Sequence, residues 1–98
     1  MSASIVRIAF AHPEQRAAIL RRLDETAAPA TRLMPGFRGA FILMDADGAT
    51  GDNLTLWETQ EQTTRVATRH APARRLLAGL GVSCAETTTC EVARHIER

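Results

Sequence analysis

The stretch Met34–Glu58, MPGFRGAFILMDADGATGDNLTLWE, decides the fold because it contains two strand-like runs joined by a polar loop. A Pro-Gly pair precedes the first run, Phe37–Met44, in which both sets of alternating positions are apolar. The loop DADGATGD carries the Asp and Gly residues that favour turns, and the second run, Leu54–Trp57, ends on the only tryptophan of the chain. Two such runs around such a loop predict a β-hairpin.

The segment before the hairpin combines a strand pattern with a helix pattern. Ser4–Phe10 alternates in a way that predicts a short first strand. A helix is expected to begin at Pro13, because proline suits the first helical position, and to run to about Ala28. Pro29 is expected to end this helix, because proline has no backbone N–H to donate.

The segment after the hairpin repeats the change from helix to strand. Thr59–Arg69 predicts a helix that His70-Ala71-Pro72 interrupts, and Ala73–Leu80 predicts a further short helix. The Thr- and Val-rich run Ala85–Ile96 predicts the last strand. The order β-α-β-β-α-β predicts an α+β, ferredoxin-like antiparallel sheet with both helices on one face, in a single domain spanning 1–98.

Charge and composition exclude several classes of function. The net charge is +1, and the twelve Arg residues are interspersed with eleven acidic ones, so we expect no nucleic-acid partner. The N-terminal residues do not resemble a signal peptide, and no apolar run approaches the ~20 residues of a membrane span. Cys84 and Cys90 lie roughly 20 Å apart along the predicted strand, too far for a disulfide. We therefore expect a cytoplasmic protein with reduced thiols, no metal site and no membrane partner.

The first strands of the predicted sheet are apolar on both faces. Simple alternation places Phe37, Phe41 and Leu43 on one face and Ala40, Ile42 and Met44 on the other. Two helices cover only one face of a sheet, and each large apolar side chain left exposed forgoes roughly 1.5–3 kcal/mol. We therefore expect a homodimer in which the open sheet faces pack together.

Across essentially the whole chain, this pattern resembles the antibiotic biosynthesis monooxygenase-like family of dimeric α+β barrels. The most recognisable pieces are Pro35-Gly36-Phe37 and Leu56-Trp57-Glu58, at the two ends of the hairpin. The family includes cofactor-independent oxygenases of aromatic polyketides, quinol monooxygenases, haem-degrading enzymes and proteins with no assigned activity. The resemblance implies a dimeric barrel that takes a small aromatic molecule and dioxygen without a cofactor.

The resemblance also implies where the site lies. In the polyketide oxygenases of the family an Asn and a Trp on the third strand line the pocket, and Asn53 and Trp57 have the matching spacing. Thr55 shares their strand face, and the wall spans ~13 Å, which suits a flat fused-ring ligand. Asn53 also fits a turn residue, and Trp57 also fits a core residue.

Basic side chains supply the other candidate groups. His70 is the natural general base by type, although a histidine at a helix break is also typical of a helix terminus or a surface position. Arg74 on the last helix and Arg7 on the first strand are candidates for binding an acidic or phenolate substrate. Arg74 also fits a solvated helix face, and Arg7 also fits an ion pair with Glu58 on a neighbouring strand.

Three functions therefore remain open. The first is a cofactor-independent monooxygenase, in which a deprotonated phenol, anthrone or quinol reduces dioxygen directly while Asn53 and the Trp57 N–H stabilise the developing oxyanion. The second is a non-catalytic dimeric ligand-binding or stress-response module. The third is haem binding with His70 as axial ligand, although the first strand offers Arg7 where the haem degraders of the family carry an Asn. The chain also has no Tyr, which some polyketide oxygenases of the family use to hold substrate.

Overall fold

The computed structural model describes the backbone of residues 1–69 and 71–98 and the side chains outside 66–73. The elements in chain order are β1 (Ser2–Phe10), the 3-10 helix η1 (Pro13–Gln15), α1 (Arg16–Arg32), β2 (Phe37–Met44), β3 (Thr50–Trp57), α2 (Gln60–Arg69), α3 (Ala71–Gly79) and β4 (Val82–Glu91). Among the described residues, no helix is long and apolar enough to cross a membrane.

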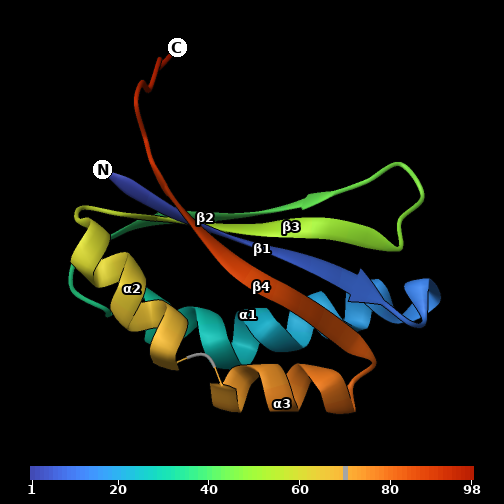
Figure 1. The fold of residues 1–98 in the computed structure, drawn as a ribbon. Coiled ribbons are helices and arrows are strands. Elements are labelled where there is room, and N and C mark those ends of the chain that lie inside the picture. The colour runs from blue at the N-terminus through green and yellow to red at the C-terminus, as the bar shows by residue number, and fades with distance from the viewer. Residues whose placement is uncertain (70) are drawn as a thin grey trace.

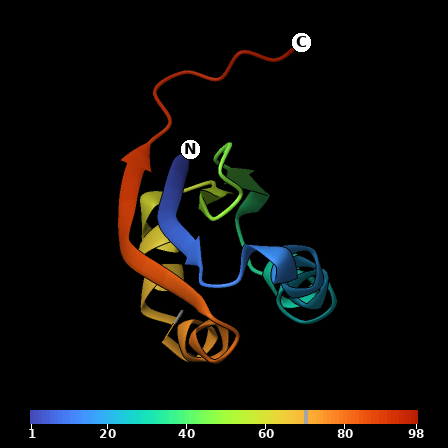
Figure 2. The same ribbon diagram turned by 90° about the vertical axis from the view of Figure 1, so that its right-hand side faces the viewer.

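The four strands form one antiparallel sheet in the order β2-β3-β1-β4. All the helices lie on one side of this sheet, α1 towards the β2 edge and α2 and α3 towards the β4 edge (Figures 1 and 2). In the described part of the chain, the other side of the sheet carries no helix. This arrangement confirms the ferredoxin-like α+β fold predicted from the sequence.

The core lies between the sheet and the helices, because alternate residues of each strand point to the helix side. Ile8 and Phe10 of β1 pack with Ile19 of α1 and Val82 of β4 as a buried cluster. The intervening residues of β1, among them Arg7, point to the open side.

A β-bulge changes the predicted facing of β2. The register with β3 shifts between Phe37 and Gly39, so Phe37 lies opposite Trp57 while Gly39 lies opposite Leu56. The extra residue reverses the alternation, and Phe37 therefore joins the helix side. The expectation that Phe37 shares a face with Phe41 and Leu43 is wrong for this reason, whereas those two residues do share the open side.

The predicted end of α1 and both predicted ends of β4 are also wrong. Helix α1 contains Pro29 and continues to Arg32, because a proline in the last turn removes one backbone hydrogen bond without ending the helix. Strand β4 begins earlier and ends earlier than Ala85–Ile96, because its length is set by pairing with β1. That pairing runs from Phe10 opposite Val82 to Ser2 opposite Glu91, and β1 offers no partner beyond it.

The Pro-Gly turn before β2 packs against the first turn of α2, where Gly36 lies against the Gln62 side chain. Gln62 and Thr59 cap the helix reciprocally: the Thr59 N–H donates to Gln62 Oε1 at 3.1 Å, and the Gln62 N–H donates to Thr59 Oγ1 at 3.3 Å. Gly36 has a φ of +80°, and a Cβ on it would lie 1.9 Å from Gln62 Oε1. The positive φ favours glycine at this position, and the glycine leaves room for the Gln62 carboxamide that caps α2.

Candidate functional site

Trp57 is the last residue of β3, and its side chain is held firmly in place. Its side chain is 0% exposed, and its indole N–H donates to Thr55 Oγ1 at 2.8 Å. Phe37 meets it edge to face, with ring centroids 5.3 Å apart and an interplanar angle of 68°. Trp57 and Thr55 therefore form one rigid, buried unit on the helix side of the sheet, with the indole N–H engaged by the Thr55 hydroxyl.

Asn53 continues the same strand face and differs from Trp57 in its surroundings. It is half-buried, and its carboxamide makes no hydrogen bond with any described residue. Its cross-strand neighbours are Val6 on β1 and Ile42 on β2. Ile42 is 39% exposed although it lies on the helix side, so the helices leave this part of the inner face open to solvent. The face thus offers an accessible, unpaired amide beside apolar side chains.

Arg74 lies on the same side of the sheet. Its guanidinium donates to Thr87 Oγ1 at 2.7 Å, and Thr87 lies opposite Val6 on β4. Because Val6 in turn lies opposite Asn53, Thr87 and Asn53 are two strand spacings apart, roughly 10 Å. The register therefore places Asn53 on one side of Val6 and Thr87, with its bound Arg74, on the other. Sequence reasoning did not include Thr87, although its place in a Thr-rich strand was visible.

Arg74 also influences Cys84 at the start of β4. Burial raises the pKa of the Cys84 thiol above its ordinary value, and the positive charge of Arg74 opposes that rise. Cys84 and Cys90 are both free thiols. Cys84 lies opposite Ile8 on the helix side, whereas Cys90 lies opposite Ala3 on the open side, so the strand carries the two thiols on opposite faces.

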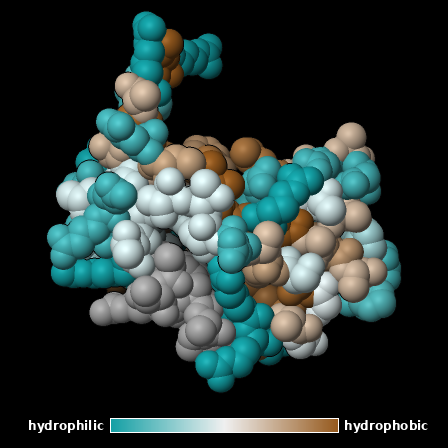
Figure 3. All heavy atoms as spheres, viewed as in Figure 1, coloured by the Kyte–Doolittle hydropathy of each residue, from teal (hydrophilic) through white to brown (hydrophobic). Residues whose placement is uncertain are grey.

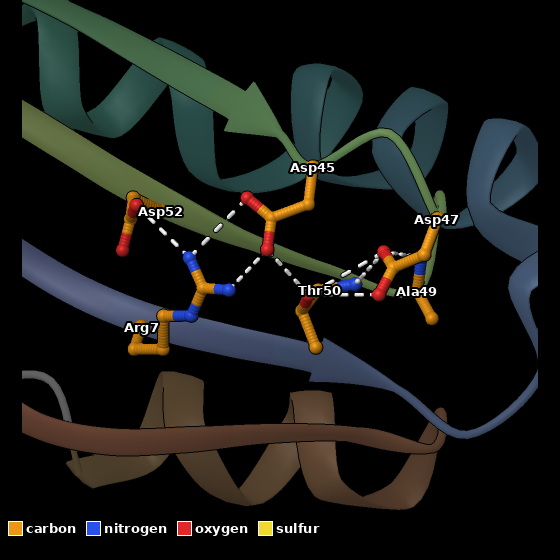
Figure 4. Close-up of polar contacts among 6 residues, drawn as sticks. All are labelled: Arg7, Asp45, Asp47, Ala49, Thr50 and Asp52. Carbon is orange, nitrogen blue, oxygen red and sulfur yellow. Dashed lines mark hydrogen bonds and ion pairs between the residues drawn. The ribbon is translucent and has the colours of Figure 1, made fainter.

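Arg7 is not part of this inner face. It points to the open side, where its guanidinium pairs with Asp45 and with Asp52, the latter at 3.1 Å (Figure 4). The predicted alternative pairing of Arg7 with Glu58 is wrong, since Arg7 lies opposite Asp52 in the register. Glu58 instead meets Arg38 at 3.4 Å.

The loop next to Arg7 is held by carboxylates (Figure 4). The Arg7 hydrogen bond holds the pKa of Asp45 below its usual range, and Thr50 Oγ1 donates to the same carboxylate at 2.7 Å. Asp47 accepts the backbone N–H groups of Ala49 at 2.9 Å and Thr50 at 3.2 Å, which lowers its pKa as well. These contacts order the hairpin loop on the open side of the sheet.

Two surface pockets lie at the ends of β1 and β4, away from Asn53. One, of about 340 Å³, is lined by Met1, Ser2, Glu58, Gln60, Thr89, Cys90 and Glu91. The other, of about 370 Å³, is lined by Ala9, Phe10, Ala11, Ala78, Gly81, Val82 and Ser83. Neither of these two contains Asn53, Thr55 or Trp57. His70, the predicted base, lies outside the described residues. No cluster of metal-binding side chains occurs among the residues that the structure describes.

Comparison with known proteins gives a result only at the level of structure. The sequence matches no known family profile, and no curated protein matches it. A monooxygenase from the gene ActVA-Orf6 of Streptomyces coelicolor, solved with Nanaomycin D, has a TM-score of 0.71 at 16% identity, over 99% of this chain and 92% of that one. A proposed antibiotic biosynthesis monooxygenase from Deinococcus radiodurans has a TM-score of 0.71 at 22% identity, over 100% and 98% of the two chains.

A third similar structure is described as having a different activity. The haem degrader MhuD of Mycobacterium tuberculosis, solved with two haems in its active site, has a TM-score of 0.72 at 21% identity, over 99% of this chain and 100% of that one. These three structures share one architecture along nearly their whole lengths. The chain therefore has the fold of the antibiotic biosynthesis monooxygenase-like structures, as its sequence predicted.

Proposed function

We propose that this protein is a monooxygenase that acts on a flat aromatic phenol, anthrone or quinol held against the inner face of β3. The observation that carries the proposal is the half-buried, unpaired carboxamide of Asn53 beside the solvent-accessible Ile42 on the helix side. A polar group of this kind beside apolar surface is typical of a small-molecule site. The fold is shared with structures described as monooxygenases, which supports the same conclusion.

The proposed roles follow from the contacts of each side chain. The Asn53 amide donates to the oxyanion that develops on the substrate. Trp57 and Thr55 are buried and hydrogen-bonded to each other, so they support from behind the strand face beside Asn53 against which the rings lie. Arg74, held beside Thr87 two strands away from Asn53, binds an acidic or phenolate group. We retain His70 as the proposed general base. Arg7 faces away from this site, so we assign it no substrate contact.

The proposed chemistry needs a base from the protein but no cofactor, because the deprotonated substrate itself reduces dioxygen. The base removes a proton from an anthrone, and the resulting anion transfers one electron to dioxygen. The substrate radical and superoxide combine to form a C–O bond, and protonation gives a hydroperoxide. Loss of water from that hydroperoxide leaves the quinone carbonyl. Donors aimed at the oxyanion and exclusion of bulk water would accelerate the first step.

We also propose that the working form is a homodimer in the cytoplasm. Phe41 and Leu43 are 56% and 53% exposed on the open side of the sheet. Ile5 and Leu54 lie on the same side between them and β4. A continuous apolar surface of this kind is typical of an interface. The cytoplasmic location rests on the sequence alone.

The test is oxygen uptake with a panel of hydroxyanthrones and naphthoquinols. We expect turnover of at least one compound, a loss of at least about tenfold with Asn53→Ala, and a raised KM with Arg74→Gln. Arg75→Gln is the matched control, since Arg75 is the exposed neighbour of Arg74 and should leave both constants unchanged. Absence of uptake across the panel would overturn the proposal. A Soret band on adding haemin, lost in His70→Ala, would replace it with haem binding, as described for MhuD.

A further inference from the structure

The last residues of the chain, Val92–Arg98, leave the sheet and are called the arm below. The Val92 N–H donates to Met1 O at 2.9 Å, and every arm residue after Val92 is exposed, with Ile96 at 74%. The arm stands on the side of the sheet opposite the helices and runs from the β4 edge towards the β2 edge without lying on the domain (Figures 1 and 2). Figure 3 shows it standing clear of the body. An extended segment that stands clear of its own domain leaves its side chains accessible to another chain.

The arm is basic. It carries Arg94, Arg98 and His95 against a single acid, Glu97, and His95 lies 3.8 Å from Glu97. If only these groups are counted, the two guanidinium groups leave an excess of positive charge at neutral pH. The arm therefore favours an acidic surface.

The open side of the sheet offers an acidic surface at its far end. Asp45 and Asp52 pair with Arg7, Asp47 lies in the same loop, and Arg16 donates to Gly48 O in that loop at 3.2 Å, so three carboxylates face two guanidinium groups there. This cluster is called the acidic end below. It is far from the arm of the same chain, because the arm leaves where Ser2 pairs with Glu91, whereas the acidic end adjoins the pairing of Ala9 with Thr50.

We propose that the arm of each copy grips the acidic end of a second copy when two open sheet faces pack together. A two-fold axis lying between the sheets and perpendicular to their strands places the arm of one copy over the acidic end of the other. Packed sheets are about 10 Å apart, and the arm extends roughly 20 Å, enough to reach past the interface to the partner. The exposed Phe41 and Leu43 form the apolar centre of the contact. The inference deepens the proposed homodimer and rests on it.

The test is a double-mutant cycle on the dimer dissociation constant of the full chain, measured by sedimentation in about 50 mM salt, where charge effects are strong. One variant, Arg94→Glu/Arg98→Glu, reverses the charge of the arm. The other, Ala46→Arg, adds a cation to the acidic end at an exposed position between Asp45 and Asp47. We expect each variant to weaken dimerisation at least tenfold and their combination to recover most of that loss. Both effects should shrink in about 0.5 M salt.

Arg21→Glu/Arg22→Glu is the matched control, because it makes the same charge change at exposed positions of α1. It should leave the dissociation constant within twofold of the unaltered chain. Loss without recovery in the combined variant would overturn the docking of the arm on the acidic end. If none of these changes affects the dissociation constant of the dimer, the arm has no role in dimerisation, although the homodimer itself would still stand. A monomeric unaltered chain would instead overturn the homodimer proposed above.

Discussion

The indole N–H of Trp57 and the hydroxyl of Thr55 form a 2.8 Å hydrogen bond between two residues of the same strand face. Both side chains are buried, so if one partner is removed, the polar group of the other cannot form a replacement hydrogen bond with water. We expect Thr55→Val to lower the free energy of unfolding by about 1–2 kcal/mol, and Trp57→Phe by about 1–3 kcal/mol. The measurement is urea unfolding followed by circular dichroism at one protein concentration, since Trp57 is the only Trp.

The combined variant tests whether this hydrogen bond is the cause. If it is, the double variant loses less than the sum of the two single losses, by roughly 0.5–1.5 kcal/mol. Strict additivity would show instead that each residue acts through its own packing.

The exposed aromatic on the open side gives a second prediction. Phe41→Glu should raise the dimer dissociation constant at least tenfold, which is about 1.4 kcal/mol, because it places a charge in the proposed apolar contact. Leu33→Glu is the matched control, since Leu33 is similarly large and even more exposed but lies at the end of α1 on the other side of the sheet. Equal effects of the two variants in sedimentation would place the interface elsewhere.

Acid stability should depend on Asp47. Its two backbone hydrogen bonds lower its pKa below the ordinary 3.8, so the folded state binds its proton less readily than the unfolded state. Its contribution to stability is therefore fully present above about pH 4 and is lost as the pH falls through the folded-state pKa. Asp47→Asn should flatten the dependence of the urea midpoint on pH between about 4 and 2.

The exposed Asp24 of α1 provides the comparison for that experiment. It makes no hydrogen bond or ion pair with the described part of the chain, so Asp24→Asn should leave the pH dependence as it is. A profile unchanged by Asp47→Asn would show that the turn contacts of Asp47 contribute nothing to folding.

Cys84 reports on the charge of Arg74. Burial raises the pKa of the thiol and Arg74 opposes the rise, so Arg74→Gln should raise the pKa further. The measurement is the pH dependence of alkylation of Cys84 in a Cys90→Ser background, where it is the only thiol. The alkylation profile should move to higher pH in Arg74→Gln and stay in place in Arg75→Gln. A shift to lower pH would mean that Arg74 does not lie near the thiol.

The sequence was sufficient for the fold because the hydrophobic periods of its helices and strands agree with one another. It was insufficient where pairing between distant residues decides the outcome. The end of β4 depends on where β1 stops offering partners, and the contacts of Arg7 depend on which residue the register places opposite it. Pro29 is a further example. The usual effect of proline predicts that the helix ends there, but α1 continues to Arg32.

The candidate site was predictable in part. The shared face of Asn53, Thr55 and Trp57 follows from strand alternation, and the structure contains it. The hydrogen bond that engages the Trp57 N–H and the contact of Arg74 with Thr87 required coordinates. No local pattern reports that two side chains from different elements meet.

The bulge between Phe37 and Gly39 makes the facing of Phe37 independent of the facing of the rest of β2. Inserting or deleting a single residue there would turn the aromatic ring of Phe37 outward while Phe41 stayed where it is. Phe37, which packs on Trp57 beneath the proposed site, is therefore set independently of Phe41 on the face proposed to meet a second copy. Under these proposals, a substitution at Phe37 need not disturb the dimer, and a substitution at Phe41 need not disturb the packing on Trp57.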